Sequence, residues 1–202
     1  TTTCVNVSTF MALMGKKVLM IDLDPQGNTT SGVGIAKKGL KGGTRELLSG
    51  KMTAKELIVE TPYRNLFVIP TNTSLSSAEF DLFEFDETEK RMKIALEEIV
   101  GEFDYILIDC SPSLGYTTLN ILTAADSVLI PVQCEYLALE GLSKLLSTIR
   151  KVKSSLNPAL EIEGFLLTMY MRNRLNNQVV NEVRSHFGEL AYETIIQRNI
   201  RL

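Results

Sequence analysis

Two aspartates stand at the end of an apolar run near the start of the chain, in the sequence VLMIDLDPQGN (residues 18–28). Asp22 interrupts the run itself, and Asp24 directly precedes a turn-forming Pro-Gln-Gly-Asn stretch. A second apolar run, DYILID (residues 104–109), ends in Asp109. An ionised carboxylate is costly to bury without a partner. We therefore expect a cation, or a water that needs a base, beside these side chains.

The positions of Asp22 and Asp109 predict one shared site. In an open parallel sheet, ligands bind at the carboxyl ends of the strands, where both residues stand. Two strand-end carboxylates suit a hydrated Mg²⁺ ion and a phosphate ligand. The alternative is that each aspartate caps the turn or helix that follows it, as Asp often does.

The elements that must position these residues alternate between strands and helices. The expected strands are short apolar runs, at 17–22, 66–69, 104–109, 127–132, 162–169 and 192–196. The expected helices lie between them, at 3–14, 53–59, 88–100, 115–124, 138–153 and 176–187. Continuous apolar strands indicate a sheet that is covered on both faces. The pattern predicts an α/β fold with a doubly wound, mostly parallel sheet and helices on both faces, forming a single domain over residues 1–202.

The composition is that of an ordinary globular protein. Hydrophobic residues make up 45% of the chain, and the net charge of -3 argues against a protein that coats nucleic acid through bulk charge. No apolar run approaches the roughly 18 residues that a membrane span needs. The three cysteines share no metal-ligand spacing, which indicates a reduced cytoplasmic compartment.

Three stretches of the chain resemble the ParA/Soj family of partition ATPases. They are residues 1–35, beginning TTTCVNVSTF and containing DPQGN; residues 103–146, beginning FDYILIDCSPSLG; and residues 164–202, beginning GFLLTMY and ending RNIRL. This family belongs to the deviant Walker A class of P-loop NTPases, together with MinD. The resemblance spans essentially the whole chain, and it implies a P-loop fold with ATP and Mg²⁺ as cofactors.

The resemblance implies a role for each strand-end residue. Thr1 and Thr2 match the tail of the family's phosphate loop, so Thr1 would bind Mg²⁺ and Thr2 a phosphate at a helix N-terminus. Asp22 would lie near the water shell of the metal, and Asp24 would orient or deprotonate the attacking water. Asp109 matches the Walker B aspartate, which holds Mg²⁺ through water.

Further residues are assigned by the same resemblance. Ser111–Gly115 match the second switch segment of the family. Relatives hold the adenine near the positions of Thr168, Met169, Arg198 and Asn199. Residues 172–202 contain five arginines and three glutamates. Of these arginines, Arg172, Arg174, Arg198 and Arg201 would bind the DNA backbone without sequence preference. The alternative for the arginines is a solvated helix face with surface ion pairs.

The chain departs from the family pattern at both ends. It begins at the threonines, so the glycines and both lysines of the phosphate loop K-G-G-V-G-K-T-T-T are absent, together with the strand before them. It stops before the S-E-A-P sequence that follows R-N-[VI]-R-L in the family. We therefore expect a truncated family member that binds nucleotide weakly or not at all as it stands.

The resemblance implies an ATP-driven switch for DNA partition. ATP would drive formation of a homodimer that binds non-specific DNA, and a ParB-type centromere-binding partner would trigger hydrolysis, in the cytoplasm on the nucleoid and without a membrane. One alternative is a non-catalytic binding protein on the same scaffold. Another is a MinD-like, membrane-associated division regulator.

Overall fold

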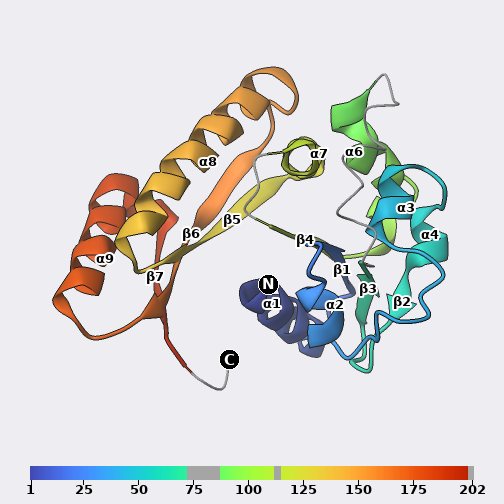
Figure 1. Ribbon diagram of the computed structural model, residues 1–202, viewed down its shortest axis with the longest axis horizontal. Helices are drawn as coiled ribbons and strands as arrows, with labels where there is room; N and C mark the ends of the chain where they lie inside the picture. Colours follow the sequence, from blue (N-terminus) through green and yellow to red (C-terminus); the bar gives the residue numbers. More distant parts are fainter. Residues whose placement is uncertain (72–86, 112–114, 200–202) are drawn as a thin grey trace. The chain divides into compact units, whose positions relative to one another are not determined.

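The computed structural model describes residues 1–71, 87–111 and 115–199 (Figure 1). The chain divides into two compact units, Thr1–Ala124 and Ala125–Leu202, which are described separately below. Each unit contains one sheet with helices packed on it.

The first unit is built around strand β1 (Val18–Leu23), in which all six residues are buried. β1 pairs in parallel with β3 (Leu66–Ile69) on one side and with β4 (Tyr105–Cys110) on the other. The short strand β2 (Val59–Glu60) adds to β3 in the antiparallel direction, which gives the order β2-β3-β1-β4. The sheet is thus mostly parallel, as the sequence predicts.

Helices surround this sheet. Those of the first unit are α1 (Thr2–Leu13), α2 (Asn28–Gly32), α3 (Thr44–Leu48), α4 (Ala54–Leu57), α6 (Arg91–Leu96) and α7 (Tyr116–Ala124), with the 3₁₀ turns η2 (Thr88–Lys90) and η3 (Val100–Glu102).

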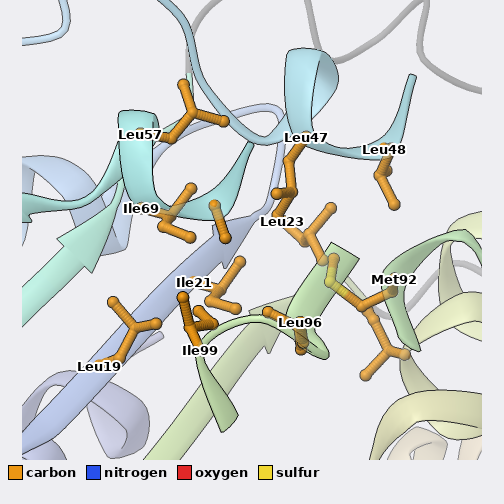
Figure 2. Close-up of a cluster of buried hydrophobic side chains, with 12 residues drawn as sticks. Leu19, Ile21, Leu23, Leu47, Leu48, Leu57, Ile69, Met92, Leu96 and Ile99 are labelled. Atoms are coloured by element: carbon orange, nitrogen blue, oxygen red, sulfur yellow. The ribbon is translucent and has the colours of Figure 1, made fainter. Parts of the chain in front are cut away.

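Successive residues of β1 point to opposite faces of the sheet, and apolar side chains cover both faces. Leu19, Ile21 and Leu23 pack in one cluster with buried residues of α3, α4 and α6, as Figure 2 shows. Val18 and Met20 pack in a second cluster, which includes Ala12 of α1. The expected fold class, a sheet with helices on both faces, is confirmed for this unit. The alternation also places Asp22 on the same face as Val18 and Met20.

The second unit contains three parallel strands, in the order β5-β6-β7. Its elements are β5 (Ser127–Gln133), α8 (Tyr136–Ser155), β6 (Glu161–Tyr170), α9 (Arg174–Phe187), the 3₁₀ turn η4 (Gly188–Leu190) and β7 (Ala191–Gln197). Its core includes Phe165 of β6, whose ring stacks on that of Phe187 at the end of α9 with 3.9 Å between centroids.

All six strands predicted from the sequence are present, and four of the predicted helices are present with ends within two residues. The prediction of a helix over 53–59 is wrong in its extent. A capping box of Thr53 and Glu56 starts α4, but the backbone turns extended at Ile58, and Val59 then pairs with Val68 in β2. A strand contact therefore replaces the last helical turn.

The single helix predicted over 88–100 is also wrong, because α6 ends at Leu96 and the side chain of Asn120 interrupts the chain's helical hydrogen bonds before α6. In a continuous helix, the Met92 amide would donate to the Thr88 carbonyl. Instead the Met92 amide donates to Asn120 Oδ1 over 3.0 Å, and Asn120 Nδ2 donates to Thr88 O over 2.7 Å and to Tyr116 O over 3.1 Å. A fully buried amide from α7 thus separates η2 from α6.

In the part of the chain that the structure describes, no helix is both long and apolar enough to cross a membrane.

Candidate functional site

The two strand-end aspartates of the first unit are neighbours in the sheet. The register of β1 and β4 pairs Asp22 directly with Asp109, at the carboxyl ends of both strands. Asp22 is fully buried and Asp109 is 6% exposed. The edge of the sheet that the sequence predicts as a site therefore holds two adjacent buried carboxyl groups.

Asp109 accepts hydrogen bonds from two threonines. Thr1 Oγ1 donates to Asp109 Oδ2 over 2.8 Å, and Thr29 Oγ1 donates to the same oxygen over 2.6 Å. The amino nitrogen of Thr1, which precedes α1, lies 2.9 Å from Asp109 Oδ1. The structure thus brings Thr1 and Asp109 together. Thr2, the first residue of α1, is exposed.

Asp22 is held by a separate set of donors. Its Oδ2 accepts from the amide of Thr30 over 2.7 Å and from Thr30 Oγ1 over 2.6 Å, and its Oδ1 accepts from the Asp24 amide over 3.2 Å. Burial raises the pKa of the Asp22 carboxyl above its usual value. The hydrogen bonds from Thr30 and Asp24 oppose this rise, and the nearby charge of Asp109 adds to it.

Asp24 lies just beyond the end of β1, in a tight turn. Its Oδ1 accepts from the Gln26 amide over 2.9 Å, and its carbonyl accepts from the Gly27 amide over 2.8 Å. Gly27 has a φ of 62°, in the left-handed region that favours glycine, and it leads directly into α2. Asp24 is half-buried, so its carboxylate differs from that of Asp22 in both exposure and partners.

Sequence reasoning missed Thr29 and Thr30, the two α2 residues that bind the aspartates. Both are fully buried, and Thr30 Oγ1 also accepts from the Thr71 amide over 3.1 Å. α2 has only five residues, too few to give a helical periodicity. The available signal was Gly27 followed by Asn28, a turn residue and a polar residue that are typical of a helix start.

The residues predicted to hold the adenine lie at the ends of β6 and β7 in the second unit. Met169 has a positive φ of 55°, and the Arg198 amide donates to Tyr170 O over 3.0 Å. A pocket here is lined by Tyr170, Met171, Arg172, Gln197 and Arg198. Of the predicted adenine residues, only Arg198 is among them. Met169 and Asn199 are the chain neighbours of these lining residues, and Thr168 is two residues from Tyr170.

Asn176, also missed, fixes the loop beside this pocket. Its Oδ1 accepts from the Met171 amide and its Nδ2 donates to the Cys134 carbonyl, each over 2.6 Å. The Asn173 side chain caps α9 by accepting from the Asn176 amide over 2.8 Å. The loop after β6 is therefore tied to the end of β5.

The arginines predicted to bind DNA are on the surface. Arg172, Arg174 and Arg198 are exposed, and Arg201 lies outside the described residues. Arg172 and Arg198 line the same pocket, whereas Arg174 lines a second one along α9. The structure therefore groups two of these four arginines. Of the predicted second switch segment, Pro112, Ser113 and Leu114 lie outside the described residues.

The oxygen atoms of the side chains at and around Asp109 are of the kind that binds a magnesium ion. Mg²⁺ prefers oxygen ligands, and it commonly keeps several waters while one or two carboxylates and the phosphates of a substrate complete its shell. Thr1, Asp22 and Asp109 offer one hydroxyl and two carboxyl groups of this kind. Within residues 1–71, 87–111 and 115–199, no three His, Cys, Asp or Glu side chains converge as a metal cluster.

Comparison with known proteins gives consistent matches. A model of a family described as an AAA domain matches residues 1–162. The sporulation initiation inhibitor protein Soj of Bacillus subtilis is 49% identical over 203 residues, which cover 100% of this chain and 80% of Soj. The chromosome-partitioning ATPase Soj of Treponema pallidum is 47% identical, with coverage of 100% and 79%.

A solved structure is similar as well. The crystal structure of cobyrinic acid a,c-diamide synthase from Mycobacterium smegmatis with bound ADP and magnesium superposes with a TM-score of 0.90. It is 36% identical in sequence, and the match covers 98% of this chain and 81% of the synthase.

Proposed function

The chain belongs to the ParA/Soj family of chromosome-partitioning ATPases, and we propose that it acts as an ATP- and Mg²⁺-dependent switch in DNA partition. The observation that carries this proposal is the pairing of Asp22 with Asp109 at the carboxyl ends of β1 and β4, bound by Thr1, Thr29 and Thr30. The relative with bound ADP and magnesium supports these cofactors.

Each residue of the site has a distinct role in this proposal. Thr1 and Asp109 hold Mg²⁺, Thr2 binds phosphate, and Asp22 supports the water shell of the ion from its buried position. A bound Mg²⁺ ion would neutralise charge on the phosphates as the γ-phosphoryl group is transferred to water. Thr29 and Thr30 fix the orientation of the two buried carboxyl groups, so that little rearrangement is needed when the ion binds.

Asp24 acts on the attacking water. The Gln26 amide binds Asp24 Oδ1, which fixes the orientation of the carboxylate. Because Asp24 is half-buried, its carboxylate is not fully withdrawn from solvent, and it can accept a proton from water or orient the water for attack.

We assign base recognition to the carboxyl ends of β6 and β7. Thr168, Met169, Arg198 and Asn199 lie on this stretch, and Asn176 fixes the neighbouring loop. The positive φ of Met169 marks a locally strained backbone, a feature that clusters at ligand sites.

In this proposal, residues 1–202 act as a single domain, and binding of ATP drives two copies to form a homodimer. The dimer binds non-specific DNA and a ParB-type partner, in the cytoplasm on the nucleoid. The exposed Arg172 and Arg174 supply contacts to phosphates. The Treponema pallidum relative is a chromosome-partitioning ATPase. Its 47% identity is higher than the 36% of the structurally similar synthase, which favours partition over amide synthesis.

In a protein extended at its N-terminus by the phosphate loop, the double variant R172A/R174A is expected to bind non-specific duplex DNA about tenfold more weakly in the presence of ATP, because each lost arginine removes a phosphate contact. The slope of log affinity against log salt should fall in magnitude by roughly one per contact. Fluorescence anisotropy over a salt series measures both quantities. Arg150, which is exposed on α8, provides the matched control R150A. Equal affinities for R172A/R174A and R150A would remove these arginines from the DNA-binding surface.

Titration calorimetry of Mg²⁺-ATP against two proteins tests the nucleotide proposal. One protein is the 202-residue chain, and the other is extended at its N-terminus by a strand and the phosphate loop K-G-G-V-G-K. The extended protein should bind and the 202-residue chain should bind weakly or not at all, since the loop lysines neutralise the β- and γ-phosphates. Omission of Mg²⁺ serves as the control. If neither protein binds, the ATPase proposal fails, and a non-catalytic binding protein on the same scaffold takes its place.

A further inference from the structure

Lys37 contacts the turn that carries Asp24, although it is thirteen residues further along the chain. Its Nζ donates a hydrogen bond to the carbonyl of Gln26, which lies in that turn. Lys37 is partly buried, whereas the neighbouring Lys38 is exposed. The two adjacent lysines therefore have different environments.

The carbonyl that Lys37 binds belongs to a hydrogen-bonded chain that ends at Asp24. The Gln26 carbonyl and the Gly27 amide form one peptide unit, and this amide donates to the Asp24 carbonyl over 2.8 Å. A cation on the carbonyl polarises the unit and strengthens the bond that its N–H group makes. The Gln26 amide, on the preceding peptide unit, donates to Asp24 Oδ1 over 2.9 Å. The ammonium group thus stabilises the turn that orients the Asp24 carboxylate.

The stem of Lys37 is also fixed by close packing. Gly27 is buried, and an ideal Cβ placed on it would lie 2.7 Å from Lys37 Cε and 2.7 Å from Thr71 Cγ2. The Lys37 stem and Thr71 therefore fill the space beside Gly27, which has a left-handed φ that other residues rarely adopt. The packing of the Lys37 stem against Gly27 therefore holds the ammonium group beside the turn.

We propose that Lys37 is a positioning residue for hydrolysis, which holds the turn at residues 24–27 in the shape that aims Asp24 at the attacking water. This inference rests on the proposed ATPase function. Lys37 acts through the Gln26–Gly27 peptide, so it affects the rate of the chemical step more than the affinity for nucleotide.

The kinetic test compares K37M, K37R and K38M in the N-terminally extended protein. Methionine keeps most of the stem and removes the charge. The kcat of K37M should fall about tenfold, as expected for the loss of one hydrogen bond from a charged donor, while KM for ATP stays within about twofold. K37R should restore most of the rate, and K38M should match the parent. Equal kcat values for K37M and the parent, or a joint change of kcat and KM, would overturn the proposal.

A second measurement needs no turnover and uses the 202-residue chain. Amide hydrogen exchange at Gly27, followed by NMR, should be about tenfold faster in K37M than in the parent, because the bond to the Asp24 carbonyl opens more often. K38M should leave it unchanged. An unchanged Gly27 exchange rate in K37M would refute the role of Lys37. If the N-terminally extended protein binds no ATP but Gly27 exchange responds to K37M, the contact is real and the ATPase proposal is what fails.

Discussion

The D24N variant is expected to hydrolyse ATP about 10³-fold more slowly than the parent while binding Mg²⁺-ATP with nearly unchanged affinity. A positioned general base contributes about 10² to 10⁴ in rate, and an amide cannot accept the proton that a carboxylate accepts. The Asn side chain keeps an oxygen for the Gln26 amide, so the turn at 24–27 should keep its shape. Binding depends instead on the other residues of the site.

Single-turnover kinetics together with calorimetry on the N-terminally extended protein separates the two effects. D126N makes the same chemical change at an exposed aspartate before β5, and it should hydrolyse ATP at the parental rate. If D24N keeps a rate within threefold of the parent, Asp24 is not the group that activates the water. If the D24N variant fails to bind nucleotide, Asp24 contributes to nucleotide binding rather than to activation of the water.

The D22N variant is expected to lose activity, and its free energy of unfolding is expected to rise relative to that of the parent as pH increases. The two effects have one cause. Residues that support a metal site commonly contribute about 10- to 100-fold in activity or metal affinity. The same carboxyl group is fully buried, and burial raises its pKa. The charged form that favours Mg²⁺ binding is therefore the form that destabilises the protein without the ion.

The pH dependence of this stability gain has a definite sign. A raised pKa in the folded state means that the native protein holds the Asp22 proton more tightly than the unfolded chain does, where the pKa is near 3.9. The stability contributed by Asp22 is thus greatest below the unfolded pKa and falls as pH rises toward the folded pKa. Asparagine has no such titration. The free energy of unfolding of D22N minus that of the parent should therefore increase across this window and then stay constant.

Urea unfolding of both proteins at a series of pH values from 4 to 8 measures this difference. Saturating Mg²⁺-ATP, added to the extended protein, should reverse the order of stability, because it stabilises only the form that binds it. A difference that is constant over the whole series, or that decreases with pH, would show that burial does not penalise the charged Asp22 carboxylate.

The strand-end carboxylates could be predicted because their position depends on a simple rule. A continuous apolar run forms a buried strand, parallel strands end at the same edge, and this is enough to bring Asp22 and Asp109 together. The fold class followed from the same alternation of strands and helices. The assignment of Thr1 and Asp109 to one magnesium site came from the family resemblance. The structure places the two side chains in contact, and their magnesium-binding role stays a prediction.

What could not be predicted depends on tertiary contacts of single residues. Thr30 binds Asp22 from a five-residue helix that has no periodicity to detect. Tyr170, Met171 and Gln197 line a pocket because two strands end beside each other, and Met169 turns the chain with a φ that no sequence pattern indicates. The break before α6 arises from a side chain 28 residues away.

That break has a mechanical consequence. Asn120 is anchored to its own helix through Tyr116 O, and its amide group also holds Met92 and Thr88. The side chain of Asn120 is fully buried and its oxygen and nitrogen are both engaged, so sliding α7 past residues 88–92 would break two hydrogen bonds at once. α7 is the next helix in the chain after Asp109, and it begins seven residues later, at Tyr116. Asn120 therefore works as a rigid linkage, and a displacement of α7 would be transmitted to the start of α6 rather than absorbed between the helices.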